Sequence, residues 1–199
     1  MLKYFFSLFV TILFVTNIYA QVQIDAEAPK FTLADSHGKE HSLVDFNGKY
    51  VVLEWINFDC PFVKKHYNSK NMQKLQKEFT DKDVVWLLIC SSAEGKQGHF
   101  NNDEINKRLG EAGANATAYL IDEDGTVGKK YGAKTTPHMF VINPDGNLIY
   151  AGAIDDKPST KVEDIDSAVN YVSDALNSAF EGKEIEVKTS VAYGCSVKY

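Results

Sequence analysis

The chain has 199 residues, of which 44% are hydrophobic and 24% are charged, values typical of a globular domain rather than a disordered or collagen-like chain. Its 27 acidic residues exceed its 21 lysines and arginines, and the net charge of −6 argues against a nucleic-acid partner because nucleic-acid-binding surfaces are basic. Three cysteines are too few for a disulfide-stapled scaffold, and the histidines show no metal-ligand spacing, so we expect neither a metal nor a cofactor.

Residues 1–20 have the pattern of a secretory signal peptide. Lys3 gives a positive start, residues 4–19 are mostly apolar, and Ala20 is a small residue before a polar stretch. The alternative is an uncleaved membrane anchor. We expect a secreted or periplasmic protein without stable membrane insertion after signal cleavage, in a compartment where disulfides persist.

The next part of the chain is predicted to consist mainly of strands. Short strands are expected at 31–35 and 39–43, and the nearly continuous apolar run at 50–56 predicts a strand buried on both faces. A helix is expected to follow Pro61. Four further strands are expected at 84–89, 118–121, 139–142 and 147–150. The last two are joined by Asn143-Pro144-Asp145-Gly146, a hairpin signal.

A weak helical pattern covers 103–112, and a much stronger one lies near the end of the chain. There, a capping-box sequence at Thr160–Glu163 and a stop signal at Gly182 bracket apolar residues that recur at three- and four-residue steps. The pattern predicts one continuous helix between the two signals. The recurring residues are Val162, Ile165, Val169, Val172, Leu176 and Phe180.

The order of these elements predicts an α/β fold. A strand, a helix and a strand, followed by a hairpin and a closing helix, are typical of a central mixed sheet flanked by helices, here with an N-terminal strand extension. Because no repeat or long linker divides the chain, we expect one domain over 21–188. A tail over 189–199 would follow it and carry Cys195.

Cys60 is the candidate for chemistry because it stands between a buried strand and a helix. Pro61 fits the first helical position, which places the Cys60 sulfur beside unpaired backbone N–H groups at the positive end of the helix dipole. Such a site stabilises the thiolate, the reactive form. Lys64, Lys65 and His66 follow within two turns and would add positive charge. The alternative is a small buried cysteine that only fills space.

The chain resembles a known family in several segments. Val51-Val52-Leu53-Glu54-Trp55 followed by Cys60-Pro61 resembles the active-site strand and helix of the thioredoxin superfamily. Residues 136–142, Thr-Pro-His-Met-Phe-Val-Ile, resemble its cis-proline segment. The Cys-Pro-Phe-Val-Lys-Lys-His run and the Gly194-Cys195-Ser196 tail are similar to the redoxin, or peroxiredoxin-like, branch, which is grouped with the alkyl hydroperoxide reductase and thiol-specific antioxidant proteins. The resemblance covers residues 24–199.

The resemblance implies roles for individual residues. Cys60 corresponds to the nucleophilic cysteine, and Glu54 to a buried carboxylate that exchanges protons during the sulfur chemistry. A carboxyl buried in a strand should have a raised pKa, which suits that role, whereas the alternative is an edge-facing glutamate paired with a lysine. Pro137 would form a cis peptide that exposes the Thr136 backbone for strand-like contact with a thiol partner.

Three departures from the family pattern argue against an ordinary dithiol reductase or a fast peroxidase. Val63 stands where a thioredoxin has its second cysteine, and Asn57 stands where a peroxiredoxin has threonine. Arg108 is the only arginine in the chain and lies in a polar stretch, where we expect a solvated side chain. Lys64 or His66 could polarise a peroxide instead, although a solvated helix face is the alternative.

A sulfenic acid or mixed disulfide on Cys60 must be resolved by another thiol. Cys195, in a tail that looks mobile, and Cys90, at the end of a neighbouring strand, are both candidates. For each, the alternative is a purely structural cysteine. A disulfide needs Cα atoms within about 7 Å, a distance that the sequence does not supply.

The function expected from these residues is thiol-based oxidoreduction with antioxidant, peroxiredoxin-like character. Cys60 would attack a peroxide or a protein disulfide, Glu54 would manage the proton, Thr136, Pro137 and Lys64 would contact the substrate, and Cys195 or an external thiol reductant would restore the sulfur. Two alternatives stay open. One is a monothiol disulfide exchanger or isomerase acting on exported proteins, and the other is a non-catalytic thioredoxin-like module that binds partners along the Pro137 edge.

Overall fold

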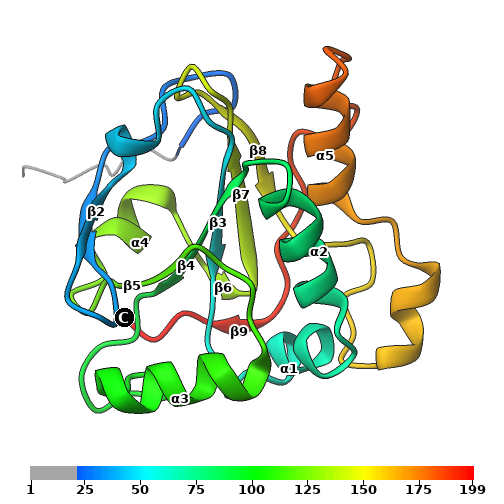
Figure 1. The fold of residues 1–199 in the computed structure, drawn as a ribbon. Helices are drawn as coiled ribbons and strands as arrows, with labels where there is room; N and C mark the ends of the chain where they lie inside the picture. Colours follow the sequence, from blue (N-terminus) through cyan, green and yellow to red (C-terminus); the bar gives the residue numbers. More distant parts are fainter. Residues whose placement is uncertain (1–21) are drawn as a thin grey trace, which may run out of the picture.

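A five-stranded mixed sheet lies at the centre of the computed structural model, which describes residues 22–199 (Figure 1). The middle strand, β3, is parallel to β4 and antiparallel to β7; β4 is parallel to β5, and β7 forms a hairpin with β8. This arrangement confirms the predicted α/β fold, while the expected signal segment at 1–20 lies outside the described residues. In spatial order the strands are β5 (Ala118–Ile121), β4 (Val85–Cys90), β3 (Val51–Trp55), β7 (His138–Ile142) and β8 (Leu148–Gly152).

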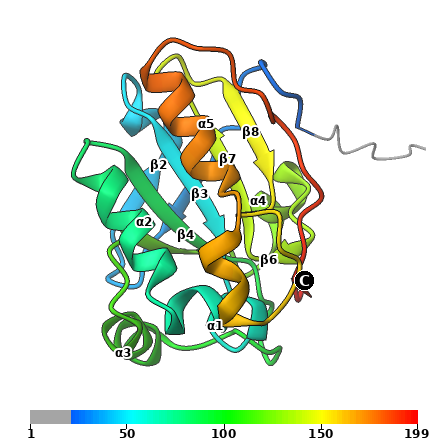
Figure 2. The ribbon, with the colours of Figure 1, turned by 90° about the vertical axis from the view of Figure 1, so that its right-hand side faces the viewer.

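Side chains of β3 alternate between two apolar cores, one on each face of the sheet. Val52 belongs to the core under most of the helices, whereas Val51, Leu53 and Trp55 belong to the other core. Since both faces are covered, every residue of β3 is buried, including the ionisable Glu54. The first core is covered by α1 (Pro61–Asn68), α2 (Asn71–Thr80), α3 (Asn102–Ala112) and α5 (Tyr171–Phe180), and the second by α4 (Thr126–Tyr131). Figure 2 shows α2 and α5 over the same face of the sheet.

The N-terminal strands form a small hairpin outside the main sheet. β1 (Thr32–Ala34) pairs antiparallel with β2 (Glu40–Ser42), and a 3-10 helix, η1 (Leu43–Phe46), follows. Phe31 and Leu43 are buried in the core that contains α4, so this segment closes that face of the sheet. No helix within residues 22–199 is long and apolar enough to cross a membrane.

The continuous helix predicted between Thr160 and Gly182 is wrong, because the structure breaks it in two. A 3-10 helix, η2 (Val162–Ser167), is followed by extended backbone, and α5 then begins behind Asn170, whose side chain accepts a hydrogen bond from the Ser173 amide. The break arises because Val169 and Tyr171 donate backbone hydrogen bonds to Asp156 and Ile154. The apolar periodicity continues across the break, but only its second half enters the core.

The tail is docked against the domain, contrary to the expected mobile segment. Residues 188–190 run beside β8, where the Ala151 amide donates to the Lys188 carbonyl. The chain then crosses to β6 (Thr135–Thr136), with which β9 (Cys195–Ser196) pairs antiparallel. Figure 1 shows this segment, in red, passing beside β6 close to α1. The pairing brings Cys195 beside Thr136, in the segment that the sequence predicts to contact the substrate.

Candidate active site

Cys60 stands at the start of α1, as the sequence predicts. Its backbone is extended (φ −71°, ψ 126°), it is the N-cap residue, and Pro61 occupies the first helical position. The Asn57 side chain accepts a hydrogen bond from the Asp59 amide and so shapes the turn between β3 and this helix. The thiol is therefore carried by a tight, hydrogen-bonded turn that opens directly into a helix.

The Cys60 sulfur is completely buried and lies between the cis-proline segment and the tail. It is 3.0 Å from the Thr136 carbonyl oxygen and 2.7 Å from the Cys195 sulfur. The Thr136–Pro137 peptide bond is cis, as the resemblance implies, and Thr136 is the backbone partner of Cys195 in the β6–β9 pairing. Of the two candidate resolving cysteines, Cys195 is therefore the one beside Cys60. The other, Cys90, donates to the Gly98 carbonyl at 3.4 Å.

The pKa values of the two neighbouring thiols are shifted in opposite directions. Burial raises the pKa of Cys60, but hydrogen bonds to its sulfur from the Cys195 thiol and the Val63 amide outweigh burial, so this pKa lies below its usual value. Burial, and then the neighbouring Cys60, raise the pKa of Cys195 to about 11. Cys60 is thus the thiol that ionises first, while Cys195 keeps its proton.

Glu54 is fully buried on the central strand, not at an edge and not paired with a lysine. It accepts hydrogen bonds from Trp86 Nε1 (2.9 Å), Tyr67 Oη (3.0 Å) and Gln76 Nε2 (3.2 Å). Burial raises its pKa to about 7, although these three donors oppose the shift. A carboxyl with this pKa can both hold and release a proton near neutral pH. Its hydrogen-bond partners within residues 22–199 do not include Cys60.

Comparison with known proteins decides the family. The sequence model of the AhpC/TSA family matches residues 24–151, more than half of the chain. The chain belongs to the AhpC/TSA family. This confirms the redoxin resemblance carried by the Cys60 and cis-proline segments, and the matched region ends before the tail that carries Cys195.

Individual relatives of this AhpC/TSA-family chain include a thiol-disulfide oxidoreductase and a thioredoxin-like protein. The thiol-disulfide oxidoreductase ResA of Bacillus thuringiensis is 29% identical over 129 residues, or 65% of this chain and 69% of the relative. The thioredoxin-like protein YneN of Bacillus subtilis is 26% identical over 147 residues, or 73% of this chain and 81% of the relative. A crystal structure of an uncharacterized conserved protein from Geobacillus kaustophilus is 25% identical with a TM-score of 0.76, covering 90% of this chain and 94% of that one. The chain is a thiol oxidoreductase with a thioredoxin-like fold.

The helix that follows the cysteine differs from the predicted solvated face. Lys64 is exposed, but Lys65 and His66 are buried. Lys65 Nζ donates to the Lys157 carbonyl at 2.9 Å and lies 3.8 Å from a carboxylate oxygen of Asp155. Burial lowers the pKa of His66 to about 4, despite the nearby Asp155, so this imidazole is neutral at pH 7 and adds no positive charge beside Cys60.

His66 instead belongs to a buried hydrogen-bond chain that reaches the tail. Asn71 Nδ2 donates to His66 Nδ1 at 2.9 Å, which leaves the proton on Nε2, 3.4 Å from the Tyr193 hydroxyl. That hydroxyl in turn donates to Asp155. Tyr193 lies two residues before Cys195, so these hydrogen bonds hold the tail in place on the N-terminal side of Cys195. Neither Tyr193 nor Asp155 has a sequence signal for this role, because the contacts among His66, Tyr193 and Asp155 join distant parts of the chain.

Tyr199 fixes the tail on the other side of Cys195. Its hydroxyl donates to the Ala133 carbonyl at 2.7 Å, and its ring lies over two glycines of the α4 segment. A Cβ at Gly125 would lie 2.4 Å from a ring carbon, and one at Gly128 would lie 2.6 Å from the hydroxyl. Gly128, inside a helix where alanine is ordinarily better, is therefore a signal in the sequence that a neighbouring group approaches closely.

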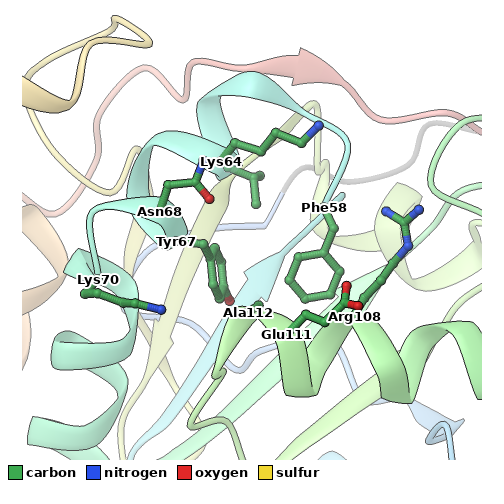
Figure 3. A pocket seen from close by; sticks show the side chains of 9 residues that line it. Phe58, Lys64, Tyr67, Asn68, Lys70, Arg108, Glu111 and Ala112 are labelled. Atoms are coloured by element: carbon green, nitrogen blue, oxygen red, sulfur yellow. The ribbon is translucent and has the colours of Figure 1, made fainter.

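Arg108 is not the solvated residue predicted. It donates to Asp59 Oδ1 (2.9 Å) and Glu104 Oε1 (2.7 Å), lies over the Phe100 ring, and is 26% exposed. With Phe58, it lines a solvent-open hollow of about 610 Å³ between α1 and α3. Figure 3 shows Arg108 and Lys64 on opposite sides of this hollow. The guanidinium supports the turn before Cys60 through Asp59 and is held by two carboxylates.

The pKa of Glu54 predicts how stability depends on pH. The pKa of Glu54 is about 7 in the folded protein, against an ordinary value of 4.5 in the unfolded chain. The carboxyl therefore stays protonated to a higher pH in the folded state than in the unfolded state. Its folded-state proton stabilises the protein below pH 4.5, and this advantage is lost as pH rises through 7, by up to about 3 kcal/mol. In urea unfolding between pH 5 and 8, Glu54→Gln should lose less stability than the unmodified protein as pH rises. Parallel stability curves would contradict the raised pKa.

Proposed function

We propose that this AhpC/TSA-family chain is a thiol–disulfide oxidoreductase in which Cys60 is the nucleophile and Cys195 is the resolving thiol. The observation that carries the proposal is the 2.7 Å separation of the two sulfurs, on residues 135 positions apart in the chain. A disulfide bond is about 2.05 Å long, so only a small movement is needed to join them. The missing second cysteine at Val63 is thereby replaced by one from the tail.

The proposed reaction uses the opposite pKa shifts of the two thiols. The Cys60 thiolate attacks one sulfur of a substrate disulfide, and the other substrate sulfur leaves as a thiolate that takes up a proton. Cys195 then loses its proton and attacks the Cys60 sulfur of the mixed disulfide, which releases the second substrate thiol. The substrate is reduced by two electrons and the protein ends with a Cys60–Cys195 disulfide. An external thiol reductant restores both thiols by the same exchange.

The other candidate residues support this reaction from fixed positions. Glu54, with a pKa of about 7, serves as a proton reservoir, and Tyr67 connects it to the hollow between α1 and α3. Thr136 and Pro137 present the backbone edge along which an extended segment pairs next to Cys60. Lys64, exposed on α1, is a contact for an incoming substrate.

Reduction of a peroxide by Cys60 is the second candidate function, and the family match favours it. In that reaction the thiolate attacks the O–O bond and becomes a sulfenic acid, and an alcohol or water leaves; Cys195 then forms the disulfide with loss of water. The pairing of Arg108 with Asp59 and Glu104 argues for the disulfide substrate. The ratio of the rates with hydrogen peroxide and with a protein disulfide distinguishes the two candidates.

The cellular setting is proposed from the sequence. The signal pattern over 1–20 places the domain of residues 21–188 and the tail of residues 189–199 in the periplasm or outside the cell. The partners there would be a protein disulfide and an external thiol reductant. A protein disulfide persists in such an oxidising compartment, whereas the reductant must reach the protein as a thiol.

The experiment that tests the proposal is disulfide mapping. One equivalent of a thiol oxidant is expected to produce one intramolecular link, Cys60–Cys195, detected by mass spectrometry of a digest made after alkylation. Cys90→Ser is the control and should give the same link in the same yield, because Cys90 donates to the Gly98 carbonyl and is hydrogen-bonded to neither sulfur. A Cys60–Cys90 link, or no link, would contradict the proposal, and no link together with an ordinary Cys60 pKa would favour the non-catalytic binding module.

A further inference from the structure

The tail occupies the backbone edge that an external thiol partner would need. Thr135 and Thr136 pair with Ser196 and Cys195, and the Val197 amide donates to the Lys134 carbonyl at 3.0 Å. This step rests on the proposed function. Residues 194–198 then imitate the substrate, because they form an extended strand whose cysteine sulfur lies beside the Cys60 sulfur. A partner strand cannot pair with β6 while the tail is there, since one edge accepts one strand.

The residue before the tail cysteine must be glycine, for two independent reasons. Gly194 has φ +145°, a backbone conformation that residues with a Cβ rarely adopt. A Cβ built on Gly194 would lie 2.1 Å from the Thr136 carbonyl oxygen and 2.7 Å from the Thr136 carbonyl carbon. The Thr136 carbonyl that blocks this Cβ is backbone rather than a flexible side chain, so it cannot move away without distorting the chain. Any strand that brings its cysteine to Cys60 along this path meets the same carbonyl.

The tail is held by contacts that lie outside the strand pairing. Tyr193 is bound to Asp155, and Tyr199 is bound to Ala133 and packed on Gly125 and Gly128. Between these two tyrosines, the paired strand is only two residues long. Losing one tyrosine contact should therefore weaken the docking of the strand without disturbing the sheet.

We propose that the β6 edge is a docking site for a protein strand in which glycine directly precedes cysteine, and that the tail is its built-in competitor. The partner enters after the tail leaves, and its cysteine then takes the position of Cys195. If the partner cysteine arrives in a disulfide, the Cys60 thiolate attacks that sulfur and expels the other half as a thiolate, so that a Cys60–partner mixed disulfide is formed. Selectivity thus comes from the backbone at Thr136.

Two peptides test the glycine requirement on the full chain. Ala-Tyr-Gly-Cys-Ser-Val-Lys and Ala-Tyr-Ala-Cys-Ser-Val-Lys, each with its cysteine joined to 5-thio-2-nitrobenzoate, release that coloured thiolate when Cys60 attacks the peptide sulfur. The reduced Cys195→Ser protein is used because its own tail cannot form the disulfide. The glycine peptide is expected to react at least about tenfold faster than the alanine peptide, given the cost of a Gly-only conformation. The symmetric nitrobenzoate disulfide is the small reagent that reports whether Cys60 reacts at all.

Competition is tested by loosening the tail in the same background. Tyr199→Ala should raise the rate with the glycine peptide at least about fivefold, because lost contacts increase the fraction of tail-free molecules, and the preference for glycine should persist. Val191→Ala is the matched control, since Val191 is 90% exposed in the same tail. Equal rates for the two peptides, no reaction with either peptide while the small reagent reacts, or no gain in Tyr199→Ala would each overturn the inference. If even the small reagent fails, the proposed role of Cys60 fails as well.

Discussion

Replacing Cys60 by serine is expected to reduce both disulfide-dependent and peroxide-dependent turnover by at least about three orders of magnitude. The serine hydroxyl remains protonated where the thiol ionises, so the substrate sulfur meets no effective nucleophile. Cys195 cannot take over, because burial is the main cause of its pKa of about 11 and burial remains after the substitution. The measurement is the steady-state rate with a protein disulfide and with hydrogen peroxide, each supplied with the same dithiol.

The structure provides the control for this result. Cys90 is buried at the end of β4 and donates to the Gly98 carbonyl rather than to Cys60 or Cys195. Cys90→Ser should therefore keep the rate close to that of the unmodified protein. Equal melting temperatures for the two serine variants would show that both are folded. Unchanged turnover in Cys60→Ser would reject the catalytic role and favour a module that binds partners along the Pro137 edge.

The first half of the site could be predicted because its signals are local. A strand of β-branched and apolar residues, a cysteine and a proline at the first helical position are contiguous, and each acts within a few residues. Glu54 could be placed in the core for the same reason, since it interrupts an apolar run buried on both faces. The raised pKa of about 7 follows from that burial.

The second half of the site depends on contacts between distant segments, for which the sequence has no periodic signal. Strand β9 is two residues long, and its two pairs with β6, Thr135–Ser196 and Thr136–Cys195, join residues about 60 positions apart in the chain. Lys65 and His66 look like a solvated helix face until Asp155 and Tyr193 are brought against them. A charge run is solvated unless a distant partner is available, and the chain order does not show the partner.

The same limitation explains the broken C-terminal helix. Apolar residues at three- and four-residue steps predict helix, but they do not show whether the backbone is needed elsewhere. Here the amides of Val169 and Tyr171 are hydrogen-bonded to Asp156 and Ile154, which pulls the chain out of helical geometry. The Asn170 cap then restarts the helix. Periodicity identified the buried half of the segment, and the competing hydrogen bonds decided where the helix begins.

Replacing Cys195 is expected to stop turnover after the first step, and a pair of substitutions separates its two roles. Both Cys195→Ser and Cys195→Ala remove the resolving sulfur, so a mixed disulfide between Cys60 and the substrate should accumulate. Steady-state turnover should fall at least about a hundredfold, because a thiol held beside its target acts at a very high effective concentration. Trapping the mixed disulfide with acid and identifying it by mass checks this result.

The two variants should differ in the ionisation of Cys60. Serine keeps an O–H group that can donate to the Cys60 thiolate, whereas alanine removes the Cys195 hydrogen bond that lowers this pKa. The pKa of Cys60, measured from the pH dependence of its alkylation rate, should therefore rise toward its ordinary value in Cys195→Ala and stay lower in Cys195→Ser. If both variants resolve the mixed disulfide at the normal rate, Cys195 is not the resolving thiol. If the pKa is the same in both, the low pKa of Cys60 comes from the Val63 amide at the helix start, and Cys195 contributes only its sulfur.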